Sequence, residues 1–369
     1  MPSLKQKLSC LGCTLLLAIA GILTWRLGPW YNTSYDATSL SVSTSCSDCC
    51  NGLESNCDLP VNQILFPTVH NAHSSYENGF ITASNNLPLE EALVAGYRGL
   101  MLESCLCDGL LGTYLLKENE GSNLGFCTSF CSSGVRGALE VLRNVKTFLE
   151  ANPNEVLIVQ IEITDNGFES LRSALNTTGL TPFIPRFSET YIQIWPTLRQ
   201  LIEANTRLLL FANGDEISSC KANECPDGIL SSLDHFSQTD LSDLESCQPT
   251  LSGDVLSSFF LMNHWKNNKA KVPSEKNAMV VNSMDVLEGR FEKCESRKRG
   301  PSFLAVDFWD VGDVLDFAEK ENLKRGGVVV VVEEEDGLDA ANDDNVTTIA
   351  IVDEGGNGTV TAEARSSGI

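Results

Sequence analysis

Basic residues are scarce in this chain. Of its 369 residues, 26 are lysine or arginine and 49 are aspartate or glutamate, so the formal net charge is -23. Such a charge repels phosphates, which excludes nucleic acid as a partner and disfavours passive adsorption to an anionic lipid surface. Part of the charge is local, because ten acidic residues and one basic residue lie from Glu333 onward.

The sequence also lacks an internal repeat, which excludes a solenoid. Hydrophobic residues make up 42% of the chain and charged residues 20%, and the mean hydropathy is -0.05. This composition is that of a folded protein rather than of a disordered chain. The length allows two domains of ordinary size or one large α/β barrel.

An apolar run extends from Leu8 to Trp25 and is flanked by Lys7 and Arg26. It is long for the core of a signal peptide and short for a membrane span. Because no small-x-small cleavage site follows, residues 1–30 are interpreted as a signal anchor in preference to a cleaved signal peptide. The rest of the chain would then be lumenal or extracellular and attached to the membrane through this segment, or secreted if the segment is cut.

Cysteine usage supports export. Two of the 14 cysteines lie in the apolar run, which leaves twelve beyond it. The spacing Cys46-x-x-Cys49 also suits a zinc site, but disulfides are favoured behind an export signal. Glycosylation sequons, which are compatible with the same compartment, begin at Asn32, Asn176, Asn345 and Asn357.

Three further segments follow from the pattern. Residues 31–58 are rich in Ser, Thr, Asn and Cys and are interpreted as a cysteine-rich stem, residues 59–332 as an α/β domain, and residues 333–369 as an acidic tail with little order. Strands are predicted at 63–68, 99–103, 155–163, 207–212, 258–263 and 303–308. Helices are predicted near 88–95, 138–150, 195–204 and 311–319. Apolar strands alternating with amphipathic helices predict a parallel sheet, here an irregular TIM-type (β/α) barrel.

Polar residues follow several of the predicted strands. His70 and Asn71 come directly after the first strand, and three other apolar runs end in Glu103, Glu162 and Asp307. The carboxyl ends of barrel strands meet at one rim, so these side chains are expected to converge. A histidine beside several carboxylates is typical of an acid/base or metal site.

These residues carry a family resemblance. The stretches Thr68-Val-His70-Asn71, Gly96-Tyr-Arg98-Gly99-Leu-Met-Leu-Glu103, Asn152-Pro-Asn-Glu155 and Leu304-Ala-Val-Asp307 occur in this order. Together they resemble the phosphatidylinositol-specific phospholipase C X-domain superfamily, and more closely its secreted or membrane-attached PLC-like phosphodiesterase branch. The resemblance covers about residues 59–322 and implies a distorted TIM barrel that cleaves a phosphodiester by internal attack.

The resemblance also implies roles for single residues. His70 matches the general-base histidine, and Asp307 is its expected orienting partner. Asn71, Glu103 and Glu162 match positions of the metal site in calcium-dependent members. Arg98 lies in the family's Gly-x-Arg-Gly signature, where a phosphate contact and a structural salt bridge are both open.

Two departures from the family pattern concern the chemistry. Where the family has Leu-Cys-His, this chain has Phe126-Cys127-Thr128, and a threonine hydroxyl does not titrate near neutral pH. His73 and His264 are the two candidates to replace the missing acid. His73 is three residues from His70 and would reach the same rim if the loop turns, and His264, the stronger candidate, ends a predicted strand. Met101 stands where calcium-dependent relatives have another carboxylate.

Three functions therefore remain open. The favoured one is a phosphoric diester hydrolase acting on a phospholipid or glycerophosphodiester head group outside the cytosol. The second is a catalytically weakened barrel that binds a lipid or glycan. The third is an adhesion or cell-surface protein built on the cysteine-rich stem.

Overall fold

The computed structural model gives two units, residues Met1–Ser34 and Tyr35–Ile369, and every described residue belongs to the second unit. The predicted signal segment lies outside the described residues. Within the described residues, no helix has the length and apolar character needed to cross a bilayer. The structure describes residues 38–42, 46–109, 116, 122–128, 130–164, 167–187, 194–213, 228–240, 244, 246–248, 258–295 and 300–327, and the backbone of strands at 329–332, 346–352 and 360–365.

Eight parallel strands form the centre of the protein. Their order in the sheet is β7-β6-β5-β2-β1-β10-β9-β8, so neighbours in the sheet also follow one another along the chain, except for β1 and β10. The strands are β1 (Phe66–Val69), β2 (Gly99–Leu106), β5 (Leu157–Glu162), β6 (Leu208–Asn213), β7 (Leu230–Ser231), β8 (Phe236–Gln238), β9 (Phe259–Asn263) and β10 (Phe303–Val306).

The sheet is curled into an incomplete barrel. The first strand, β1, pairs with the last, β10, in register from Phe66 with Phe303 to Val69 with Val306. The two edge strands, β7 and β8, are joined by the short helix α8 (Ser232–His235), and in the described part of the chain no ladder connects them. The predicted α/β barrel with an irregular wall is therefore confirmed.

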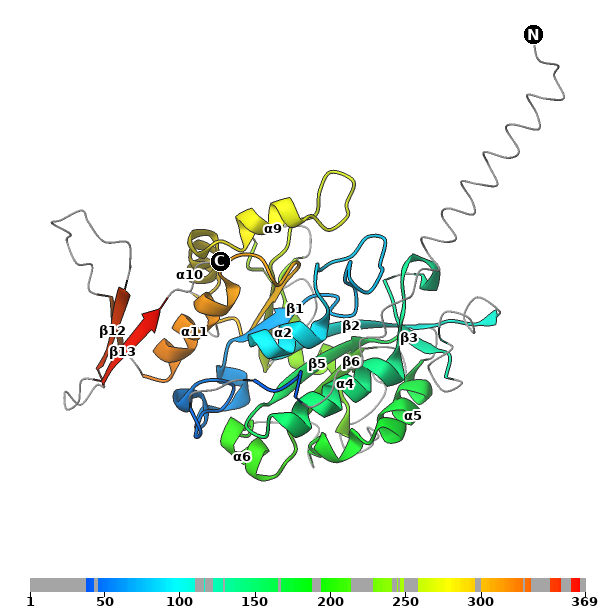
Figure 1. Cartoon of the computed structure of the whole chain (residues 1–369), viewed down its shortest axis with the longest axis horizontal. Helices are drawn as coiled ribbons and strands as arrows, with labels where there is room; N and C mark the ends of the chain where they lie inside the picture. The colour runs from blue at the N-terminus through cyan, green and yellow to red at the C-terminus, as the bar shows by residue number, and fades with distance from the viewer. Residues whose placement is uncertain are drawn as a thin grey trace, which may run out of the picture. The chain divides into compact units, whose positions relative to one another are not determined.

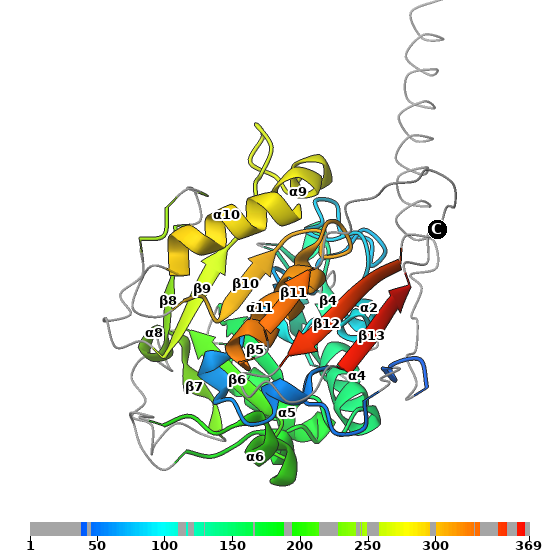
Figure 2. The same cartoon turned by 90° about the vertical axis from the view of Figure 1, so that its left-hand side faces the viewer.

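Helices cover the outside of this sheet, as Figures 1 and 2 show. The α-helices are α2 (Leu89–Ala95), α4 (Ala138–Ala151), α5 (Phe168–Thr178), α6 (Leu198–Glu203), α9 (Glu275–Val281), α10 (Met284–Glu295) and α11 (Val314–Arg325). Single 3-10 turns are η1 (Glu54–Asn56), η2 (Val61–Gln63), η3 (Cys131–Ser133) and η4 (Thr181–Phe183). In α4, apolar residues recur every three or four positions, so one face is buried against the sheet.

Aromatic rings fill the inside of the barrel. The ring of Phe236 in β8 lies 4.9 Å from that of Phe211 in β6 and 5.1 Å from that of Phe303 in β10. Neither β6 nor β10 is a hydrogen-bonded neighbour of β8. Contacts between such strands require a curled sheet, so the rings pack across the barrel interior as a core of their own.

A hairpin extends β2 beyond the barrel. Strand β3 (Leu124–Phe126) pairs antiparallel with β2, and β4 (Arg136–Gly137) pairs antiparallel with β3. Two disulfides, Cys105–Cys127 and Cys107–Cys131, cross-link the end of β2 to the segment between β3 and β4. A further disulfide, Cys247–Cys294, fixes residue 247 to α10.

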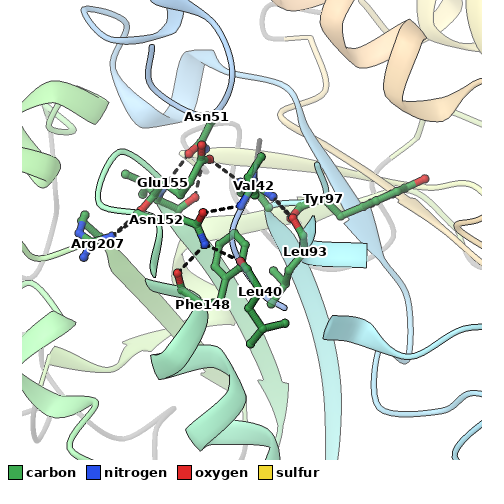
Figure 3. A network of polar contacts seen from close by, with 11 residues as sticks. Leu40, Val42, Asn51, Leu93, Tyr97, Phe148, Asn152, Glu155 and Arg207 are labelled. Carbon is green, nitrogen blue, oxygen red and sulfur yellow. Dashed lines mark hydrogen bonds and ion pairs between the residues drawn. The ribbon is translucent and has the colours of Figure 1, made fainter. Parts of the chain in front are cut away.

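The cysteine-rich segment is docked on the amino end of the barrel. Its pairs Cys46–Cys49 and Cys50–Cys57 are disulfides, which confirms disulfides over zinc ligands. The Asn51 side chain donates to the carbonyl of Val156 at 3.0 Å and accepts from its N–H at 2.7 Å. Asn152 at the end of α4 similarly bonds Leu40 and Val42 (Figure 3). The described part of the predicted stem is thus packed on the barrel.

A separate antiparallel sheet is formed by β11 (Val329–Val332), β12 (Val346–Val352) and β13 (Val360–Arg365), in that order. Two of these strands lie in the 333–369 stretch, where the acidic composition predicts little order. The stretch Val-Thr-Thr-Ile-Ala-Ile-Val of β12 is rich in β-branched residues, which favour strands.

Candidate active site

Alternation along the strands turns one set of side chains into the barrel. In β5, Ile158 packs with the interior rings while Val159 and Ile161 pack outside against the helices. Continuing this period of two turns Glu162 inward at the carboxyl end of the strand. Register places Glu162 between Glu103 of β2 and Asn213 of β6, so three oxygen-bearing side chains follow one another along the rim.

His70 and Asp307 are brought together on neighbouring strand ends. The Nδ1 atom of His70 lies 2.7 Å from Oδ1 of Asp307, and their side chains are 19% and 4% exposed. Since a carboxylate accepts, Nδ1 donates, which leaves Nε2 of the neutral ring as a proton acceptor. The Asn282 side chain donates to the backbone carbonyl of Asp307 at 3.1 Å and so fixes the backbone of this residue.

The His70 ring is stacked on Trp265. The two ring centroids are 3.8 Å apart and their planes differ by 6°. The His70 backbone is fixed as well, because its N–H donates to Val306 and its carbonyl accepts from the buried amide of Asn85. Trp265 and Asn213 were not among the predicted site residues, although each lies at or just after the end of a predicted strand.

The acidic residues of the rim offer oxygen donors, which suit calcium. In the described part of the chain, however, no three His, Asp or Glu side chains bring ligand atoms within reach of one ion; the single such group is Cys105, Cys107 and Cys131, whose sulfurs are in disulfides. A cation held by Glu103 and Glu162 would therefore depend on amide oxygens, water or substrate for its other ligands. These oxygen donors fit calcium, but only Glu103 and Glu162 among them carry a charge.

Asn71 follows His70 with a left-handed backbone, φ 45°, a conformation that asparagine tolerates better than most residues. Its carbonyl accepts from Asn85 at 3.3 Å and its amide donates to the hydroxyl of Ser84 at 3.4 Å. The residue therefore lies in the hydrogen-bonded loop that supports His70.

Thr128 and His73 lie together beside the hairpin. Nε2 of His73 is 3.3 Å from the hydroxyl oxygen of Thr128, and the histidine is fully buried. Burial, reinforced by the neighbouring His70 and Arg136, lowers the pKa of His73 to about 3. The ring is therefore neutral at pH 7, and neither member of this pair supplies an acid near neutrality.

His264 is placed outside the barrel wall. It alternates with the inward residues Asn263 and Trp265, and its ring is buried between the sheet and the helices. Its Nε2 donates to the carbonyl of Val281 at 2.7 Å, and its Nδ1 accepts from Arg290 at 2.9 Å. Burial and Arg290 lower its pKa to about 4. The structure does not bring His264 to the rim with His70.

Arg98 lies at the opposite end of the barrel from His70. It precedes β2, and its guanidinium contacts Glu155 at 2.5 Å and the carbonyls of Leu93 and Tyr97. Its side chain is 5% exposed and also stacks over Phe148. Of the two roles that the signature left open, this geometry is that of the structural salt bridge.

The fold and these side chains define a barrel of the phospholipase C type, and comparison with known proteins agrees. The family model PI-PLC X 1 matches residues 112–322, so the chain belongs to the PI-PLC X family. The match includes Asp307 and begins beyond His70.

Proteins of similar sequence occur in a plant and a fungus. A PI-PLC X domain-containing protein of Arabidopsis thaliana is 27% identical over 290 residues, which cover 72% of this chain and 63% of that protein. PI-PLC X domain-containing protein 1 of Arthroderma benhamiae is 25% identical, with 72% and 87% covered. An uncharacterized secreted protein of the same fungus is 24% identical, with 72% and 61% covered. The chain thus matches under two thirds of the length of two of these relatives.

Among solved structures, the phosphatidylinositol-specific phospholipase C of Listeria monocytogenes is similar, with a TM-score of 0.47 and 16% identity. The match covers 78% of this chain and 98% of the Listeria chain.

Proposed function

We propose that this chain cleaves a phosphodiester in a phospholipid or glycerophosphodiester head group, with His70 as the general base. The observation that carries the proposal is the pairing of His70 with the buried carboxylate of Asp307 at 2.7 Å, at the carboxyl rim of a barrel. A histidine whose Nδ1 is held by a carboxylate presents Nε2 in a fixed direction and tautomer.

In the proposed reaction, Nε2 of His70 takes the proton of the attacking hydroxyl, from the substrate or from water. The attacking oxygen bonds to phosphorus while the bond from phosphorus to the leaving oxygen breaks. The leaving oxygen then needs a proton. With Thr128 at the usual acid position and His73 buried and neutral, that proton would come from water, and the reaction would be slow.

Calcium is proposed as a partner of this chemistry, held by Glu103 and Glu162 with Asn71 or Asn213 nearby. Bound there, it would neutralise the charge of the phosphate. Arg98, which is paired with Glu155 at the other end of the barrel, is not proposed for this role.

A second proposal is a barrel that binds a phosphodiester head group without turning it over. The observation that favours it is the contact between Thr128 and His73, because Thr128 stands at the usual acid position and the buried His73 is neutral at pH 7. His70 and Asp307 would then orient a bound phosphate.

Turnover by the full chain distinguishes the two functions. Purified protein is incubated with phosphatidylinositol and glycerophosphodiesters, with and without calcium, and release of the head group is measured. We expect slow release that His70→Ala reduces by about 10²–10⁴-fold. Asp285→Asn on the exposed side of α10 is the control and should leave the rate unchanged. Absence of release across the panel, with head-group binding that depends on His70, would establish the binding protein instead.

The proposed location is extracytoplasmic, either secreted or attached through residues 1–30. Five disulfides within the described residues support an oxidising compartment. The exposed Asn176 at the end of α5 is a glycosylation candidate in that compartment. Sequencing the amino terminus of the mature protein would separate an uncut anchor from a cleaved signal peptide.

A further inference from the structure

One loop at the rim carries a charge opposite to that of the whole protein. Between residues 265 and 284, directly after Trp265, there are four lysines and one acidic residue, Glu275, in a chain with a net charge of -23. Figures 1 and 2 show this loop and α9 projecting from the end of the barrel toward which β9 and β10 run. The lysine loop is defined here as residues 266–274, with Lys266, Lys269 and Lys271.

The lysines of this region are exposed and unpaired. Among the described residues, no carboxylate forms an ion pair with Lys266, Lys269, Lys271 or Lys276. Lysines elsewhere behave differently, since Lys146, Lys320 and Lys324 each contact a glutamate. In so acidic a protein, an unneutralised group of lysines is available for an anionic partner.

The loop is held in one shape by its own hydrogen bonds. The N–H of Asn268 donates to Val272, and the Asn268 side chain accepts from Ala270 at 2.8 Å. The Asn277 amide of α9 donates to the carbonyls of Lys266 and Asn267 at 3.2 and 3.1 Å. The lysines are therefore presented by an ordered projection, which lowers the entropy cost of binding.

Apolar side chains are exposed beside the lysines. Met279 and Val280 of α9 are 62% and 63% exposed. They lie three and four residues after Lys276, so the three share one helix face. Exposed apolar side chains next to lysines are typical of surfaces that rest on an anionic lipid layer.

Acidic residues set the boundary of this surface. Asn86 donates to Glu275 at 3.1 Å and to Asp310 at 3.0 Å, and partial burial together with the nearby Glu77 and Asp310 raises the pKa of Glu91. Anionic lipid is repelled on that side. The favourable contact is therefore confined to the lysine loop and the exposed face of α9.

We propose that the lysine loop, together with Lys276, Met279 and Val280 of α9, docks on the surface of a membrane that contains anionic phospholipid. Because Lys266 follows Trp265, which stacks on His70, docking there would place the rim beside lipid head groups. The inference goes beyond the proposed function, since docking does not require turnover.

Co-sedimentation of the full chain with vesicles tests this surface. Vesicles of phosphatidylcholine are compared with vesicles in which about a third of the lipid is phosphatidylserine, at about 0.1 M and about 1 M salt. We expect the anionic lipid to increase binding at low salt, and the triple variant Lys266→Gln/Lys269→Gln/Lys271→Gln to weaken that increment roughly tenfold or more. Residues 8–25 are the same in every variant, so the measured quantity is the difference between variants at a lipid concentration at which the parent is only partly bound.

The control triple Lys146→Gln/Lys320→Gln/Lys324→Gln removes the same charge from other helices and should bind nearly as the parent does. Met279→Ser/Val280→Ser should weaken binding with little dependence on salt. Equal weakening by the two lysine triples, or no response to phosphatidylserine, would overturn the proposal. His70→Ala should bind like the parent, so a failure of the proposed chemistry and a failure of membrane docking give different results.

Discussion

The two ends of this barrel treat their polar residues in opposite ways. At the amino end, the side chains of Arg98 and Glu155 are each 5% exposed and contact each other. Asn51 and Asn152 likewise use donor and acceptor atoms on nearby backbone groups. At the carboxyl end, His70 has one nitrogen bound by Asp307, while Nε2 has no partner among the described residues. Polar groups whose hydrogen bonds are all made within the protein stabilise the fold, whereas a group that keeps one atom unpaired can act on a substrate.

The largest expected effect is on the carboxyl end. Asp307→Asn keeps the size of the side chain and removes the carboxylate that holds Nδ1 of His70. We expect turnover to fall about 10²–10⁴-fold, because the ring loses its orientation and tautomer, while the free energy of unfolding changes little. Steady-state kinetics and denaturant unfolding measure the two quantities. A rate that stays near that of the parent would remove Asp307 from the site.

Arg98→Ala should have the opposite signature at the amino end. It leaves Glu155 buried without its partner, and breaking a buried ion pair in this way costs about 3–5 kcal/mol. Denaturant unfolding measures that loss, and turnover per folded molecule should remain. The exposed ion pair of Arg199 with Asp58 provides a matched control, since water and salt screen an exposed pair and Arg199→Ala should leave the free energy of unfolding nearly unchanged. Loss of turnover with unchanged stability in Arg98→Ala would instead return Arg98 to the phosphate site.

The smallest effect, per unit of pH, is a dependence of stability on pH that comes from two buried histidines. His73 and His264 are buried, and their folded-state pKa values, about 3 and about 4, lie below the ordinary value of 6.5. Between pH 6.5 and these lower values, the unfolded chain binds more protons than the folded protein. The stability that the neutral histidines contribute is therefore fully present above pH 6.5 and is lost as the pH falls. We expect each histidine to contribute on the order of 1 kcal/mol per pH unit in that window.

Unfolding of the parent and of His264→Gln at several pH values between about 4 and 7 checks this dependence. The variant should be less stable at pH 7 and should show a shallower slope. An equal slope in both proteins would mean that His264 is protonated in the fold.

Much of the barrel is predictable from the sequence because its strands are apolar runs. All six predicted strands overlap observed ones, and the helix predicted at 138–150 is α4. Strands β7 and β8 escaped prediction because they have two and three residues, too few to show a period. Helix α10 was missed because its exposed side mixes apolar and charged residues, with Val286 at 39% exposure.

The candidate site is only partly predictable for a related reason. His70, Glu103, Glu162 and Asp307 follow apolar runs, and strand order then gathers them. His264 also ends a strand, but a shift of one residue along a strand reverses the direction of the side chain. Trp265, one position later, is therefore the residue that meets His70. Which of two adjacent residues points inward depends on where β9 starts, and the apolar stretch of β9 does not reveal that.

Because His70 and Asp307 meet only where β1 pairs with β10, the proposed reaction requires the complete barrel. His70 and Asp307 are separated by 237 positions in the chain and meet only across this last junction of the sheet. A nascent or shortened polypeptide that stops before residue 303 has the base without its carboxylate, and an exposed edge on its first strand. Hydrolysis by this protein, as proposed, would thus come only from molecules in which β1 and β10 have already paired.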